Sequence, residues 1–108
     1  FENNNIKVER ISGKDRYETS MIIANKFFPN SSASIFASGD KFVDAITGVA
    51  VSNKIDGPIF LCKGNEPNKE QLDYMKKNKT EFVYILGGTR SIPQNFEDYI
   101  KSYLDFYL

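Results

Sequence analysis

The sequence contains no histidine and a single cysteine, Cys62. Without histidine, the usual general base, the Ser-His and Cys-His nucleophile systems and most zinc sites are excluded. A lone cysteine likewise excludes an internal disulfide and any metal site built from several cysteines. We interpret Cys62 as a small apolar residue of a buried strand. These absences argue against an enzyme, and we predict no catalytic residue, no cofactor and no bound metal.

Net charge and long apolar runs are also missing. Lys plus Arg and Asp plus Glu both total 14, so no bulk charge draws the molecule onto nucleic acid or an anionic membrane. No apolar run approaches the roughly 20 residues of a membrane-spanning helix, and Phe1 begins without a basic segment leading into an apolar one. We therefore expect neither a membrane anchor nor a signal peptide. The opening without Met favours a processed or excised piece of a longer protein.

What the sequence does contain is one domain of alternating strand and helix patterns. Its 108 residues and 41% hydrophobic content predict a single folded domain over residues 1–108. Strands are expected where Ile, Val and Phe concentrate, at residues 6–11, 34–38, 58–62 and 82–86. The last three are nearly continuous apolar runs, which is typical of strands buried on both faces.

Helical patterns lie between and after these strands. The first helix is expected after Asp15, which forms a start signal of the capping-box type with Glu18. Residues 42–53 form a small-residue pattern suited to packing on a sheet, and residues 68–79 a polar helix that should be solvated. From Pro93 onward an apolar stripe is formed by Phe96, Ile100, Tyr103 and Tyr107. This alternation predicts an α/β fold of three layers, with a mainly parallel four-stranded sheet flanked by helices.

Small and basic residues gather where the expected strands end. Ligands of open α/β sheets bind beyond the carboxyl ends of the strands, and the four turns there bring five bases to one edge, namely Lys14, Arg16, Lys41, Lys63 and Arg90. Glycine turns, helix N-termini and basic side chains together suit an anionic ligand. In an alternative that stays open, Asp15 and Asp40 cap helices and neutralise these bases, and the glycines only turn the chain.

No nucleotide-binding motif accompanies these turns. The sequence lacks both the Walker pattern and a Gly-x-Gly-x-x-Gly turn. Asp40 ends a strand as a phosphate-accepting aspartate would, but no acidic pair accompanies it to hold magnesium. Asp40 and Asp44 are spaced like an acid and a base, yet helix capping for Asp40 and structural hydrogen bonding for Asp44 are the interpretations we favour.

Four stretches, taken in order, resemble the type 2 cell-wall-binding repeat of clostridial surface-layer proteins, cell wall proteins and autolysins: residues 10–20, 36–48, 58–64 and 83–92. The Arg-Ile-Ser-Gly and Asp-Arg-Tyr signatures of that family fall on residues 10–13 and 15–17, and its Ser-Gly-Asp and Asp-Ala elements on residues 38–40 and 44–45. The aliphatic run linked to polymer retention, usually Ile-Leu-Leu, falls on Ile59, Phe60 and Leu61. Phe60 departs from this pattern, as does Cys62, where Thr is common.

The resemblance implies an α/β repeat that usually occurs three in tandem around a pseudo-threefold axis. Such repeats hold an anionic secondary wall polymer non-covalently on the surface of Gram-positive bacteria. Only one repeat is present, so the resemblance favours either an excised repeat or one that forms a homotrimer. The terminal helix carries more Tyr and Phe than one helix face needs, and it is therefore a candidate interface, ordinary core packing being the alternative.

We accordingly expect a secreted, non-catalytic wall-anchoring module, located extracellularly at the cell wall or surface layer. Its expected partners are an anionic cell-wall polysaccharide and either sister repeats or a homotrimer, without nucleic acid or membrane insertion. The predicted polymer-binding residues are Arg10, Lys14, Arg16, Asp40, Lys41, Ile59, Phe60, Leu61 and Arg90. The alternative is a structural oligomerisation domain in which the same Arg and Asp residues pair between repeats. A third hypothesis, an α/β enzyme acting on a phosphorylated small molecule, is disfavoured by the missing His and acidic cluster.

Overall fold

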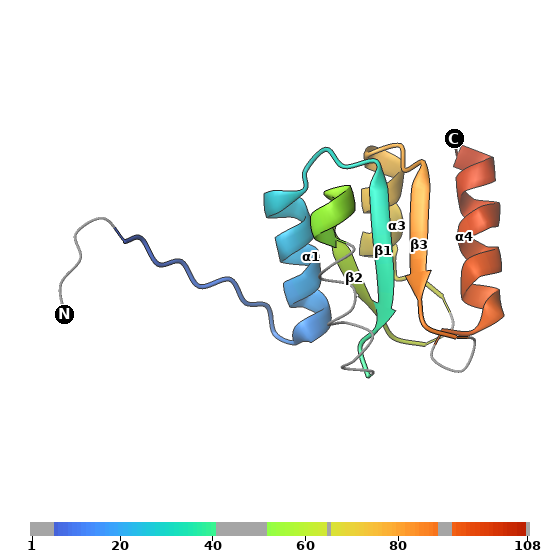
Figure 1. Ribbon diagram of the computed structural model, residues 1–108. Coiled ribbons are helices and arrows are strands. Elements are labelled where there is room, and N and C mark those ends of the chain that lie inside the picture. The colour runs from blue at the N-terminus through green and yellow to red at the C-terminus, as the bar shows by residue number, and fades with distance from the viewer. Residues whose placement is uncertain (1–5, 41–51, 65, 89–91, 108) are drawn as a thin grey trace.

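The computed structural model of the chain describes residues 6–40, 52–64, 66–88 and 92–107, with side chains described as far as Leu104. Helices and strands alternate along these residues (Figure 1). The elements are α1 (Arg16–Phe27), β1 (Ala33–Ser38), β2 (Ile59–Cys62), α3 (Lys69–Lys77), β3 (Phe82–Leu86) and α4 (Gln94–Tyr107). A short helical turn at 52–55 precedes β2. The predicted α/β class is confirmed.

The sheet of the described residues has three parallel strands in the order β2-β1-β3. Ile35 of β1 pairs with Ile59 on one side and with Tyr84 on the other, which fixes the register of both neighbours. All six residues of β1 are buried, as the continuous apolar pattern of this strand predicts for the centre of a parallel sheet. In β3 the burial falls away, and Phe82 and Tyr84 are 53% and 38% exposed.

The core is centred on Phe36 of β1. Its ring centroid lies 5.4 Å from that of Phe60 on β2 and 5.2 Å from that of Phe96 on α4. Phe60 in turn packs edge-on against Tyr74 of α3, at 5.1 Å between ring centroids. Rings at these separations gain favourable edge-to-face contacts in addition to their burial. The aromatic cluster therefore fixes α3 and α4 to the sheet, and the predicted stripe on the final helix is confirmed at Phe96 and Ile100.

Two of the predicted helices, the first one and the one at residues 68–79, have capped starts. Asp15 Oδ1 accepts a hydrogen bond from the backbone N–H of Glu18 at 2.8 Å. The Glu18 carboxylate reaches back to the N–H of Lys14 at 2.9 Å, one residue before the cap. Asn68 and Gln71 form a reciprocal capping box at the start of α3, at 2.8 and 3.1 Å. These bonds satisfy amides that the first helical turn leaves without partners.

The structure corrects two expectations from the sequence, the strand at residues 6–11 and the solvated helix at residues 68–79. Residues 6–11 form no strand, because the alternating pattern has no neighbouring strand to pair with, and Ile6 and Val8 are 60% and 90% exposed. The described sheet accordingly has three strands rather than four. Helix α3 is not wholly solvated, since it buries Gln71, Leu72, Tyr74 and Met75. The helix expected at 42–53 lies mostly outside the described residues, so the third layer stays a prediction.

Candidate functional site

The turns at the carboxyl ends of β1 and β2 meet at Tyr17, in the first turn of α1. The Arg16 guanidinium donates a hydrogen bond to the backbone oxygen of Gly39, directly after β1. The Tyr17 ring lies against Gly39 so closely that a Cβ there would stand 2.5 Å from Tyr17 Cε1. Lys63, which follows β2, has its Nζ 5.5 Å from the Tyr17 ring centroid, and Arg16 Cζ is 5.9 Å away. We call Arg16, Tyr17, Gly39 and Lys63 the Tyr17 cluster.

Neither cation of this cluster forms an ion pair with a carboxylate of the described residues. Arg16 and Lys63 are both exposed, and the ion pairs described for the chain lie elsewhere, at Lys26–Glu9, Lys69–Asp73 and Lys101–Glu97. Both cations are within the distance at which an aromatic face attracts a positive charge. The arrangement leaves the outward sides of two cations accessible to a solvent-borne anion.

Of the two roles that the alternative gives to Asp15, helix capping is confirmed and neutralisation of the bases is not. The Asp15 carboxylate accepts from the start of α1, but it forms no ion pair with the strand-end bases of the described region. Asp40 is exposed, and its backbone N–H donates to Ser38 Oγ at 3.2 Å. Asp15 thus caps α1, and the described ion pairs show no neutralisation of Lys14, Arg16 or Lys63.

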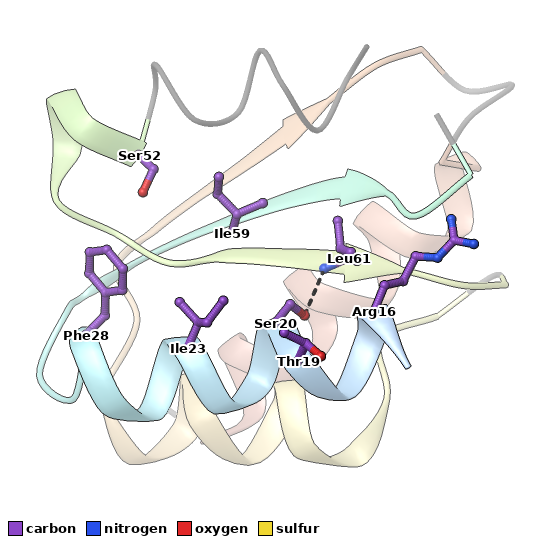
Figure 2. Close-up of a pocket in the computed structure, with 8 residues that line it drawn as sticks. All are labelled: Arg16, Thr19, Ser20, Ile23, Phe28, Ser52, Ile59 and Leu61. Carbon is purple, nitrogen blue, oxygen red and sulfur yellow. Dashed lines mark hydrogen bonds between the residues drawn. The ribbon is translucent and has the colours of Figure 1, made fainter. Parts of the chain in front are cut away.

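An open groove of about 550 Å³ runs between α1 and β2 beside this cluster (Figure 2). Ile23 of α1 and Ile59 and Leu61 of β2 line it, with Arg16 toward one end and Phe28 toward the other. The Leu61 backbone N–H donates to Ser20 Oγ at 3.5 Å, which ties α1 to the outer edge of β2. The groove is mainly apolar and ends at a fixed positive charge.

The predicted site residues fall into four groups, of which three lie within the described residues. Lys14, Arg16 and Asp40 are exposed in the turns at the carboxyl edge, Arg10 is exposed in the extended segment before α1, and Ile59 and Leu61 are half-buried in the groove. Phe60 is fully buried and lies on the face of β2 opposite Ile59 and Leu61, because alternate residues of a strand face opposite sides of the sheet. Its burial argues against the predicted contact between Phe60 and polymer. Lys41 and Arg90 lie outside the described residues.

Tyr17 is the residue that the sequence analysis missed as a site component. The sequence places it in the Asp-Arg-Tyr signature at residues 15–17, whereas the glycine that makes room for it, Gly39, stands in the strand-end turn after β1. Lys63 was recognised among the strand-end bases but not included in the predicted binding set. A large aromatic residue in the first turn of a helix, followed later by a Ser-Gly-Asp turn, is a signal that could have paired them.

Cys62, at the end of β2, is buried and takes part in no disulfide. Burial raises the pKa of the Cys62 thiol to about 12, which leaves it protonated and poorly nucleophilic at neutral pH. Within the described ranges, no group of three or more His, Cys, Asp or Glu residues is placed to hold a metal ion. No helix in the same ranges has the length and apolar character to cross a bilayer.

These observations define a small α/β domain with basic and aromatic side chains at the carboxyl edge of its sheet. Comparison with known families shows which family it belongs to. The chain belongs to the family Cell wall binding domain 2 (CWB2), whose profile matches residues 10–97. This confirms the resemblance to the type 2 cell-wall-binding repeat. Family membership gives the chain a cell-wall-binding role and indicates a location at the cell wall or cell surface.

Relatives and solved structures of longer proteins carry the same domain. The chain is 29% identical over 95 residues to the amidase enhancer of Bacillus subtilis (strain 168), covering 88% of this chain and 14% of that protein. It is 26% identical to the N-acetylmuramoyl-L-alanine amidase LytC of the same strain, covering 88% of this chain and 19% of that protein. The fold matches Cwp8 from Clostridium difficile with a TM-score of 0.75, at 30% identity over 89% of this chain and 16% of that one. Cwp6 from Clostridium difficile matches in fold with a TM-score of 0.77 at 22% identity, over 95% of this chain and 18% of that one.

Proposed function

We propose that the domain is a non-catalytic anchor that binds an anionic secondary cell-wall polymer non-covalently at the Tyr17 cluster and the adjoining groove. One observation carries this proposal. Arg16 and Lys63 come from different turns, meet at one tyrosine ring and form no described ion pair. An extended polymer with regularly spaced anionic groups would supply the missing charge.

Each part of the surface has a chemical task in this proposal. The guanidinium of Arg16 and the ammonium of Lys63 bind anionic groups through charge-assisted hydrogen bonds. Ile59 and Leu61 offer an apolar wall to the less polar faces of sugar rings. Lys14 and Asp40 lie within two residues of members of the cluster. Arg10, and Lys41 and Arg90, which follow β1 and β3 in the sequence, complete the proposed binding set.

The relatives support binding rather than catalysis as the task of the domain. The match to this chain covers 14% of the amidase enhancer and 19% of the amidase LytC, so a minor part of each protein corresponds to this chain. We infer that the domain attaches a longer, secreted protein to the wall or surface layer of a Gram-positive bacterium.

The alternative function is that of a structural domain between repeats. Exposed Phe82, Tyr84 and Tyr99 favour it, since sister repeats or a homotrimer could cover these side chains. Salt separates the two functions: added salt should release an anionic polymer while the oligomeric state is retained.

Sedimentation with purified cell walls tests the proposal. The chain should sediment with walls that retain their anionic polymer and stay in solution with walls from which acid has extracted it. Lys63→Gln should weaken sedimentation with intact walls. Equal sedimentation with both wall preparations would show that bare peptidoglycan or another component is the ligand.

A further inference from the structure

The extended segment at residues 6–11 has the pattern of a strand but no strand beside it. Ile6 and Val8 alternate with Lys7 and Glu9, as expected of a strand that covers one apolar face. Both apolar side chains are instead mostly exposed. The only polar contact described for this segment is the exposed ion pair between Glu9 and Lys26. A β-prone segment is therefore held away from any sheet.

Among the described residues, no strand pairs with the outer edge of β3. Phe82 N–H donates toward the β1 side, to Ser32 O at 3.2 Å, and the groups of alternate residues in a parallel strand point in opposite directions. The backbone groups of Val83 and Ile85 therefore point away from β1, and no hydrogen bond to them is described from beyond that edge. The opposite edge of the sheet, at β2, is occupied by α1 through the Leu61–Ser20 contact.

A groove of about 310 Å³ adjoins the open edge. Val83 and Ile85 of β3 and Ile100 of α4 form its apolar lining, and the ion-paired Glu97 and Lys101 complete it. A strand added to β3 would direct every second side chain toward this groove. Two apolar residues spaced two apart, as Ile6 and Val8 are, match that requirement.

The chain cannot place its own residues 6–11 at this edge. Asp15 is fixed as the cap of α1, and the four residues 12–15 span at most about 14 Å when fully extended. A strand outside β3 would lie three strand spacings from β2, which is already about 14 Å before the distance from α1 to β2 is added. Figure 1 shows the segment leaving the domain on the side of α1, with β3 and α4 on the other side.

We propose that residues 6–11 of one copy of this domain add as a strand to the free edge of β3 in a second copy. The donated segment would bond to the outward backbone groups of Val83 and Ile85 and place Ile6 and Val8 in the groove beside α4. Because an unpaired strand edge is a ready template for another chain, this contact gives the domain a directional, head-to-tail interface. It is independent of polymer binding at the Tyr17 cluster.

Paramagnetic broadening between two differently labelled chains tests the proposal. One full-length chain carries Lys7→Cys with a nitroxide and Cys62→Ala to remove the native thiol; the other is isotope-labelled and carries no nitroxide. In the mixed sample only contacts between molecules can broaden the observed signals. We expect selective broadening of the amide signals of residues 83–86, and none when the nitroxide is reduced.

Two proline variants of the nitroxide-bearing chain provide the specificity control. Alternate amides of a strand face opposite sides, so either Lys7 or Val8 must donate to β3 in any register. For these variants the nitroxide is moved to Glu9→Cys. Of Lys7→Pro and Val8→Pro, the one that removes the donating amide should abolish the broadening. Val8→Thr, which keeps the amide, should retain it. A chain that is monomeric in the mixed sample, or broadening confined to surfaces other than β3, would overturn the proposal. Sedimentation with cell walls would be unaffected by that result.

Discussion

The Tyr17 ring occupies the space that any side chain at Gly39 would need, since a Cβ built there lies 2.5 Å from Tyr17 Cε1 and 2.6 Å from the tyrosine oxygen. Gly39 cannot yield, because its N–H donates to Cys62 O at 3.1 Å and its own carbonyl accepts from Arg16. The glycine of the Ser-Gly-Asp turn thus positions a residue from another element of the fold.

Gly39→Ala should therefore displace the Tyr17 ring and weaken polymer binding. The colliding atoms are at the far end of a side chain that can rotate, so the expected loss of folding free energy is only about 1 kcal/mol. Calorimetric titration with wall polymer and urea unfolding would measure the two effects separately. Gly88→Ala is the matched control, because no atom lies within 4 Å of a Cβ at that position; an equal loss of affinity in both variants would contradict the assigned role of Tyr17.

Lys63→Gln should lower polymer affinity roughly fivefold to tenfold while leaving stability nearly unchanged. The change removes one of the two cations beside Tyr17, and the difference from the unmodified chain should shrink as salt is added. Lys77→Gln makes the same change in charge at the carboxyl end of α3, also at an exposed position. Equal losses in the two variants would indicate a general charge effect in place of a local site.

Phe60→Leu should lower the free energy of unfolding by about 1–2 kcal/mol, less than the 3–5 kcal/mol typical of truncating a buried Phe to Ala. The smaller side chain loses ring contacts with Phe36 and Tyr74. Polymer affinity per folded molecule should not change, because Phe60 is inaccessible. Leu61→Ala, one residue along the strand and in the groove, should lower polymer affinity more than it lowers the free energy of unfolding. A drop in affinity for fully folded Phe60→Leu would refute the assignment of Phe60 to the core.

The stability of the domain should fall in alkaline solution between pH 9.0 and about 12. The Cys62 thiol ionises near its ordinary pKa of 9.0 in the unfolded chain, but burial raises its pKa to about 12 in the folded one. Within this range the unfolded state binds fewer protons, so the free energy of unfolding decreases as pH rises. Urea unfolding across the range should show a shallower decline for Cys62→Ala, and an unchanged slope would exclude Cys62 as a cause. Tyr74, whose pKa is raised from 10.0 to about 12 by burial, should contribute the remainder.

Local patterns predicted the elements whose partners are close in sequence or whose composition is unambiguous. The apolar runs of β1, β2 and β3 and the capping signal at Asp15 needed no tertiary information. Residues 6–11 show the limit of this approach, because alternation describes a surface suitable for pairing and carries no information on whether a neighbour is within reach. In α3, the many charged residues suggested a solvated helix. Its buried face depends on a tertiary contact, the packing of Tyr74 against Phe60, which the local sequence does not show.

The sequence predicted the sheet edge at which the candidate site lies, but not which side chains meet there. The turn after each strand shows where basic residues gather, since parallel strands end on the same side of a sheet. The selection of Tyr17 as the meeting point of Arg16 and Lys63 depends on distances between separate turns. The sidedness of β2 was also overlooked, and this placed Phe60 in the binding set beside residues that face the other way.

The position of β1 at the centre of the sheet also has a consequence for how the domain folds. This strand comes first in the chain, but both strands that pair with it come later: Ile35 must wait for Ile59 and then for Tyr84. No hairpin can nucleate such a sheet, and closing two long loops makes its formation intrinsically slow. During synthesis β1 therefore remains an unpaired apolar segment until β2 and β3 have followed it, and a chaperone that shields residues 33–38 over that interval should raise the folding yield more than one acting on any helix.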